Sequence, residues 1–209
     1  MLYQQHYQPH LQIPPQMQPP HIFPRRSRSP SPAPLQAPPI PPMRFEPKTI
    51  LNATTSQPIF TTQIEKSSFS GSKKGYTLLQ HHTGAPIAHI RFSTMDSHNI
   101  ALTIHGAPNK ITEDGKWVHF RWCFTPVAFP GKVWWWTEKK RRFELRDEGD
   151  VVIARIEGDV LLVENVGLSE RAVDEVVASA FAMWLQKRKE KGNREAGDAI
   201  GEIAGAIAG

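Results

Sequence analysis

The segment from Leu168 to Gly192 most constrains the fold, because it has the pattern of a helix that is too apolar for a protein surface. Apolar residues recur at steps of three and four positions, which is the period of one helical face. These residues are Val173, Val176, Val177, Ala180, Phe181 and Trp184. Further alanines, Met183 and Leu185 fill much of the remaining circumference. A helix that is apolar on nearly all sides needs burial on nearly all sides, so the rest of the chain has to surround it.

The ends of this helix are marked by residues with known capping preferences. Ser169 is a suitable N-cap, because its hydroxyl can accept a free backbone N–H of the first turn. Gly192 is the expected C-terminal stop, so we predict a helix over 169–191. The apolar run from Val176 to Leu185 is shorter than the roughly 20 residues that cross a bilayer. We therefore expect no transmembrane segment.

Short β-prone runs separated by turn residues fill the chain from Lys48 to this helix, at a spacing of about ten residues. Side chains alternate clearly in several runs, as in Ile100, Leu102 and Ile104 against Thr103. The predicted strands are Thr49–Ala53, Ile59–Ile64, Tyr76–His81, Ile87–Ser93, Asn99–His105, Trp117–Thr125, Val133–Thr137, Arg141–Arg146, Val151–Ile156 and Val160–Val166. A long loop is expected over 106–115. The pattern predicts a mostly β domain over 48–191, a closed antiparallel barrel around the central helix.

Residues 1–47 contain most of the prolines and have too little apolar content to offset the entropy of ordering, so we predict a disordered arm. The run Pro38–Pro42 favours polyproline II, which SH3 and WW domains bind. A plain flexible tether is the alternative. Ser29 and Ser31 each precede a proline in an arginine-rich stretch, and we hypothesise that they are phosphorylated.

Composition limits the compartment and the chemistry. One cysteine, Cys123, excludes an internal disulfide framework, and no secretory signal opens the chain. These features predict an intracellular protein, cytoplasmic or peripheral to a membrane. The chain has 25 Lys and Arg against 20 Asp and Glu, a balance too mild to predict nucleic-acid binding. No catalytic, cofactor or metal-binding motif is recognisable, so we expect neither an enzyme nor a cofactor or metal site.

The order of elements late in the chain resembles a known family. The basic–aromatic run Arg141–Leu145 is followed by Val152–Ile156, an apolar strand and the hydrophobic helix. This order resembles the tubby C-terminal-like superfamily, which includes tubby proteins, phospholipid scramblases and plant LURP-one-related proteins, and it is most similar to the uncharacterised fungal branch. The resemblance covers roughly 48–191. It implies a barrel of about twelve strands around the helix and membrane phosphoinositide binding.

One cluster in the predicted barrel suits such a surface, because interfacial aromatics beside basic residues favour an anionic bilayer. Its predicted lipid-binding residues are Trp134, Trp136, Lys139, Lys140, Arg141 and Arg142. Alternation places Trp135 opposite its two neighbours, so at least one tryptophan belongs to the core. Core aromatics beside a solvated charge run are the first alternative. A nuclear-localisation patch, and hence a nuclear protein, is the second.

The last residues, 192–209, are predicted to form a flexible tail rich in glycine and alanine. Four glycines recur at intervals of four, which would let helices approach closely if the tail were helical. The sequence therefore predicts a non-catalytic tubby-like binding module, with an anionic membrane surface as its partner. The alternative function is a protein-interaction scaffold that acts through the proline-rich arm and this tail.

Overall fold

The computed structural model describes residues 39–66, 73–93, 98–115, 121–165 and 167–207. Within these ranges, the side chains of residues 66, 73, 74 and 192–207 are left undescribed. The predicted phosphorylation sites Ser29 and Ser31, and nearly all of the predicted arm, lie outside the described residues.

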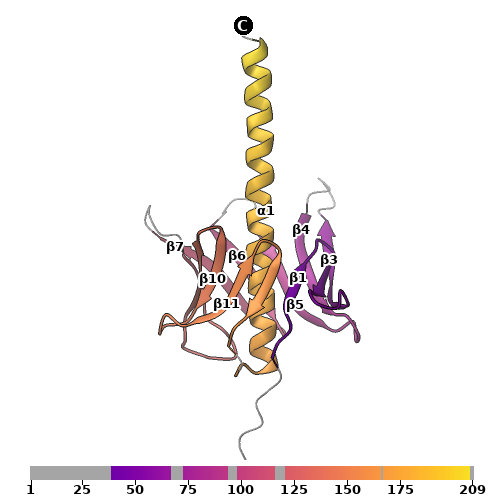
Figure 1. Cartoon of the computed structure of the whole chain (residues 1–209), viewed down its shortest axis with the longest axis vertical. Helices are drawn as coiled ribbons and strands as arrows, with labels where there is room; N and C mark the ends of the chain where they lie inside the picture. The colour runs from indigo at the N-terminus through magenta and orange to yellow at the C-terminus, as the bar shows by residue number, and fades with distance from the viewer. Residues whose placement is uncertain (1–38, 67–72, 94–97, 116–120, 166, 208–209) are drawn as a thin grey trace, which may run out of the picture. The chain divides into compact units, whose positions relative to one another are not determined.

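The domain is a closed barrel of twelve strands, in which every strand pairs antiparallel with both neighbours (Figure 1). The strands are β1 (Met43–Phe45), β2 (Thr49–Asn52), β3 (Pro58–Lys66), β4 (Lys73–Gln80), β5 (Pro86–Phe92), β6 (Asn99–Ile104), β7 (Ala107–Asp114), β8 (Arg121–Phe124), β9 (Trp134–Lys139), β10 (Arg142–Arg146), β11 (Val152–Glu157) and β12 (Val160–Val163). Strands follow one another around the wall in chain order, and β1 closes the barrel against β12. The predicted fold class is confirmed.

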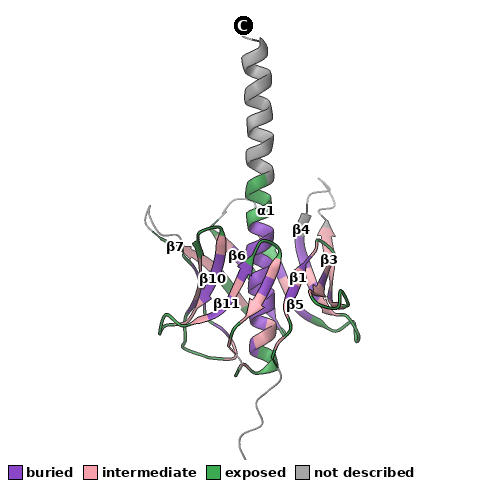
Figure 2. Cartoon of the chain, viewed as in Figure 1, coloured by how far each residue is buried: buried purple, intermediate pink, exposed green. Residues whose placement is uncertain are grey.

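The helix α1 (Glu170–Ile207) starts at one end of the barrel, runs through its interior and leaves at the other end (Figures 1 and 2). Val176, Val177, Ala180 and Phe181 are fully buried in the core, Trp184 is nearly so, and Val173 is partly buried. At the start, the backbone N–H of Ala172 donates to Ser169 Oγ over 3.3 Å, as the N-cap prediction requires.

The helix does not end at Gly192, so this part of the prediction was wrong. α1 continues to Ile207, into the region where a flexible tail was expected. Residues 193–207 contain no proline, and their most frequent residues are alanine, isoleucine and glycine. Each interior glycine costs about 1 kcal/mol relative to alanine, which weakens a helix without ending it.

Two strands were missed by the sequence analysis. β1 lies inside the predicted arm, so the barrel begins at Met43 and not at Lys48. It is only three residues long and flanked by prolines, but Met43 and Phe45 both point into the core. β7 occupies most of the predicted loop 106–115, although Pro108 and Asn109 are residues typical of loops. The ten predicted strands correspond to the other ten.

Candidate functional site

The turn between β9 and β10 presents two basic residues in a strained conformation. Lys139 pairs with Arg142 across the ladder, which leaves Lys140 and Arg141 as a two-residue hairpin loop. Their φ angles are 47° and 72°, both in the left-handed region that such a turn requires. Asn-Gly is the usual choice there, because other residues pay a steric cost. Both side chains are exposed and, within the described residues, neither forms an ion pair.

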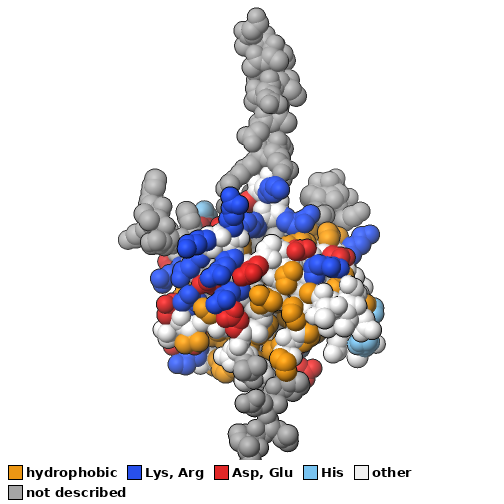
Figure 3. All heavy atoms as spheres, viewed as in Figure 1, with side chains coloured by type: hydrophobic (Ala, Val, Ile, Leu, Met, Phe, Trp, Pro, Cys, Tyr) orange, Lys and Arg blue, Asp and Glu red, His pale blue; other side chains and the backbone are white. Residues whose placement is uncertain are grey.

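The helix carries a second basic run to the same end of the barrel. Lys187 Nζ lies 2.6 Å from Glu138 Oε1 and 4.7 Å from the centre of the Phe143 ring, so the helix contacts both strands of the hairpin. We call residues 138–142 and 187–191 together the basic collar. Eight Lys or Arg and two Glu give the collar a net charge of +6. Figure 3 shows basic side chains gathered where α1 leaves the barrel.

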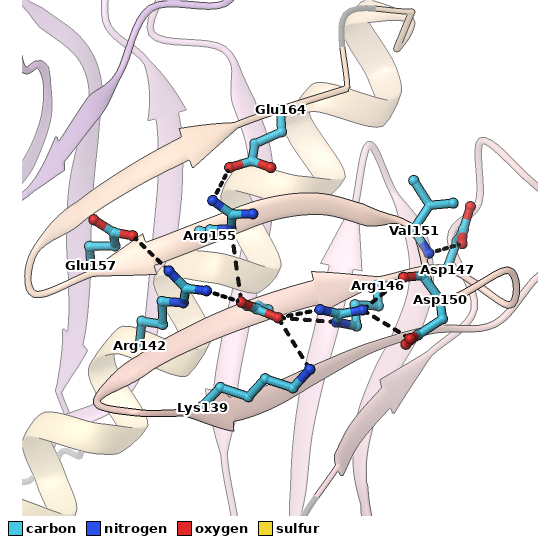
Figure 4. Close-up of polar contacts among 10 residues, drawn as sticks. Lys139, Arg142, Arg146, Asp147, Asp150, Val151, Arg155, Glu157 and Glu164 are labelled. Carbon is cyan, nitrogen blue, oxygen red and sulfur yellow. Dashed lines mark hydrogen bonds and ion pairs between the residues drawn. The ribbon is translucent and has the colours of Figure 1, made fainter.

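Beneath the hairpin tip, a buried carboxylate holds four cations on the outer face of the sheet (Figure 4). The Glu144 side chain is 2% exposed, although it points away from the barrel interior. Its oxygens lie 2.7 Å from Arg142, 2.6 Å from Arg146, 3.7 Å from Lys139 and 3.9 Å from Arg155. Burial alone would raise the pKa of Glu144, but hydrogen bonds and charges from Arg146 and Arg142 offset this, and the pKa is lowered.

A second ring of acids completes this cluster, which we call the Glu144 cage. Each arginine of the cage has a further acidic partner. These are Glu157 for Arg142 at 3.6 Å, Asp150 for Arg146 at 3.0 Å and Glu164 for Arg155 at 2.8 Å. Four cations therefore face four anions, and the cage is close to neutral. Its contacts join β9, β10, β11 and the segment after β12, so it acts as a rigid base for the exposed tip of the hairpin.

The tryptophans of the predicted lipid-binding cluster are placed differently from the basic residues. Trp134 and Trp136 are only 4% and 0% exposed and point into the core. This corrects their predicted surface position, because strand alternation sends both side chains inward. Trp135 points outward and is half-buried, with the Arg121 guanidinium 5.3 Å from its ring centre. The four basic residues of the cluster do lie together in the collar.

The opposite end of the barrel carries two carboxyl groups on the first turns of α1, of which Glu175 is buried and Asp174 partly buried. Glu175 accepts backbone N–H groups from Val127 and Ala128, both over 2.7 Å. Asp174 Oδ2 lies 2.9 Å from His105 Nε2. Burial raises the pKa of both carboxyl groups, against the lowering effect of these hydrogen bonds. They link the helix to the loops that cover this end.

A third polar cluster has the residue types of a catalytic triad but not its hydrogen-bond directions. Thr77 Oγ1 lies 2.9 Å from His89 Nδ1, and Glu65 lies 3.5 Å from Nε2. Arg91 Nε also donates to Nε2, over 2.9 Å, and arginine can only donate. Nδ1 therefore carries the proton and donates to Thr77, so His89 is not placed to activate the hydroxyl.

Metal and thiol chemistry also find little support in the described part of the chain. No group of three or more His, Cys, Asp or Glu residues there could hold a metal ion. Cys123 is half-buried, and its pKa is raised by burial and then by Asp114, which favours the unreactive thiol. Within the described residues, no helix is both long enough and apolar enough to span a membrane.

Glu144 was not among the predicted site residues, although the sequence contains a signal for it. Arg142, Glu144 and Arg146 alternate with Phe143 and Leu145, so the three charged residues share one face of a strand. Its cross-strand partner Arg155 could be predicted only from the register of β10 against β11, which the sequence does not specify.

No protein-family model, curated protein or solved structure matches this chain.

Proposed function

We propose that this protein is a non-catalytic, tubby-like module that binds an anionic membrane surface through its basic collar. The observation that carries the proposal is the convergence of two basic runs, separated by more than forty residues of sequence, where α1 leaves the barrel. The twelve-stranded barrel with a central helix agrees with the architecture that the tubby resemblance implies.

The size of the charge makes the proposal physically reasonable. Each Lys or Arg near an anionic leaflet contributes about 1 kcal/mol, and the effect falls off within a Debye length. Residues 138–142 and 187–191 carry +6 against +5 for the whole chain, although two of these cations, Lys139 and Arg142, are also paired with Glu144. The rest of the molecule is therefore slightly acidic overall, and the long-range field orients the collar towards a negative surface.

The strained turn supports a role for its charges beyond folding. Asn-Gly at positions 140 and 141 would satisfy the backbone better than Lys-Arg does. Residues held in unfavourable backbone conformations tend to occur where function requires them. The exposed side chains at the tip, free of ion pairs among the described residues, are thus the best candidates for first contact with lipid headgroups.

A double variant in this turn tests the proposed membrane binding. The double variant Lys140→Asn, Arg141→Gly removes two charges while installing the preferred turn residues, so its melting temperature should be unchanged or higher. Binding to phosphatidylcholine vesicles containing phosphatidylserine should fall by about thirtyfold, from about 2 kcal/mol of lost attraction. Flotation assays at low and high salt measure this, and pure phosphatidylcholine vesicles serve as the uncharged comparison.

A matched control removes the same charge elsewhere. Lys110 and Lys132 are exposed and lie outside the collar, so Lys110→Gln, Lys132→Gln should lower binding only slightly. Equal losses in both double variants would show that net charge, and not the collar, governs binding. Absence of binding by the unmodified chain would reject the membrane proposal.

The scaffold alternative rests on the arm and the end of the helix, and no contact of the described residues favours it. The deletion that tests this alternative has to leave β1 in place. Deleting residues 1–47 would remove β1, which pairs with both β2 and β12. A deletion that tests the arm should therefore keep the chain from Pro39 onward, because Ile40 already packs against the core.

A further inference from the structure

Exposed large apolar side chains gather in one place. Among the residues whose side chains are described, three large apolar side chains are exposed: Phe129 at 37%, Val133 at 39% and Val151 at 54%. Phe129 and Val133 belong to the loop between β8 and β9, and Val151 follows the turn between β10 and β11. Glu148 joins these segments, because it accepts the Val133 N–H over 2.9 Å and lies 3.3 Å from Lys132 Nζ.

A hollow of about 220 Å³ lies between these two segments. Its lining includes the apolar side chains of Phe129, Trp134, Ile153 and Leu168. This volume is below the roughly 300–1,000 Å³ of typical small-molecule sites. It suits one bulky side chain of a protein segment better than a complete small ligand.

The wall of the hollow formed by the β10–β11 turn is rigid and acidic. Asp147 Oδ1 accepts N–H groups from Gly149 over 3.0 Å and Val151 over 2.9 Å, which fixes the turn. Such preorganisation lowers the entropic cost of binding. Figure 4 shows Asp147 and Asp150 beside Val151 at this end of the hairpin. The Asp150 side chain is 73% exposed and Glu148 is 44% exposed; Arg146 and Lys132 pair with them, so with Asp147 the turn and its partners keep one net negative charge.

We propose that this hollow, lined by Phe129, Trp134 and residues 147–149 of the turn, docks an extended protein segment with a bulky apolar residue next to arginines or lysines. The apolar side chain enters the hollow, and the basic residues face the acidic turn. Charge complementarity selects this occupant over an acidic segment, and it excludes an anionic lipid surface, which the same acids would repel. The basic collar lies at the opposite ends of β9 and β10, so both surfaces can be occupied together.

The test uses the full chain and a fluorescein-labelled peptide of sequence GSLFRRSG, followed by fluorescence polarisation. The matched control peptide is GSLFEESG. Val151→Lys places a cation on the turn just after the lining residues 147–149, at a side chain that is 54% exposed and outside the core. The control variant Ala101→Lys makes the same kind of change at an exposed position on β6.

We expect Val151→Lys to weaken binding of the basic peptide by at least about tenfold, and Ala101→Lys to leave it within about twofold. The acidic peptide should bind at least about tenfold more weakly than the basic one. Phe129→Ala should also weaken binding, which tests the apolar contact separately from charge. Failure of the basic peptide to bind, or equal binding by Val151→Lys and the unmodified chain, would overturn the proposal. Vesicle binding should be the same in Val151→Lys, which keeps this test independent of the collar.

Discussion

Lys187 on the central helix reaches Glu138 at the end of β9, with 2.6 Å between Nζ and Oε1. Both side chains are about half exposed, at 45% and 54%, so solvent screens the pair and its contribution to stability is about 0–1 kcal/mol. Its importance is positional. The contact fixes the basic run of the helix beside the basic hairpin, and Glu138 is one of the two negative charges in the collar.

Removing that negative charge should strengthen membrane binding. Glu138→Gln changes the collar from +6 to +7 while keeping the size of the side chain. Affinity for vesicles containing phosphatidylserine should rise by about fivefold, equivalent to about 1 kcal/mol. Glu170→Gln makes the same change at the far end of the helix and should have little effect. Weaker binding by Glu138→Gln would show that the Glu138–Lys187 contact matters more to the collar than one unit of net charge.

The Glu144 cage predicts a large effect on stability. Glu144→Gln leaves four cations around a neutral amide, and removing one partner of a buried ion pair costs about 3–5 kcal/mol. Glu157 contacts the same Arg142 but is 49% exposed, so Glu157→Gln should cost less than about 1 kcal/mol. Urea unfolding of both variants measures the difference. Equal midpoints would mean that Glu144 is not effectively buried.

The same carboxylate predicts a direction for acid dependence. The pKa of Glu144 is lowered from its ordinary value of 4.5, so the unfolded chain binds the proton more readily than the native state does. Its stabilising contribution is fully present above pH 4.5 and is lost as pH falls through the lowered pKa. The stability gap between the unmodified chain and Glu144→Gln should therefore narrow on acidification. A gap that widens would contradict this assignment.

The fold was predictable because the central helix leaves few alternatives. Residues such as Ala178 and Ala182 make α1 apolar on most sides, and about ten alternating runs supply the wall. β1 escaped prediction because three residues carry almost no periodic signal. It forms because Met43 and Phe45 close the last gap between β2 and β12, which is a property of the finished barrel.

One part of the collar, the hairpin, could be predicted from the sequence, and the other part, the basic run of the helix, could not. The basic hairpin is contiguous, so Lys139 to Arg142 could be identified from sequence. The place of the helical run 187–191 in the collar could not be predicted, because its approach to Glu138 depends on the path of α1 through the barrel. Trp136 was misplaced because an aromatic residue beside basic residues has the same local pattern in a core strand and at a membrane surface.

The buried acid at the other end of the helix predicts the opposite pH behaviour. The pKa of Glu175 is raised above 4.5 by burial, so the native state binds the proton more readily than the unfolded chain does. Its contribution to stability should fall as pH rises from 4.5 through the raised pKa. Glu175→Gln removes this dependence. Calorimetry across that pH range should show a flatter profile for the variant, whereas an unchanged profile would place the dependence on Asp174.

The Glu175→Gln variant also tests the loop attachment. An amide has one oxygen to offer two backbone N–H groups, so the N–H of Val127 or Ala128 loses its acceptor. A buried donor without a partner costs about 1–3 kcal/mol, which should appear at neutral pH. Hydrogen exchange of these two amides should become faster in the variant. Protected amides in Glu175→Gln would show that another group holds the loop.

The aromatic cluster between helix and wall gives the most direct test of the architecture. Phe181 is fully buried, and its ring centre lies 5.6 Å from Phe45, 6.0 Å from Tyr76 and 5.6 Å from Trp184. Phe181→Ala should lower the free energy of unfolding by about 3–5 kcal/mol, since it leaves a cavity among rigid rings. Phe129→Ala, at a 37% exposed position, should cost far less. Because Phe45 lies on the strand that closes the barrel, β1 amides should lose hydrogen-exchange protection first in Phe181→Ala. Equal melting temperatures for the two variants would place the helix outside the barrel.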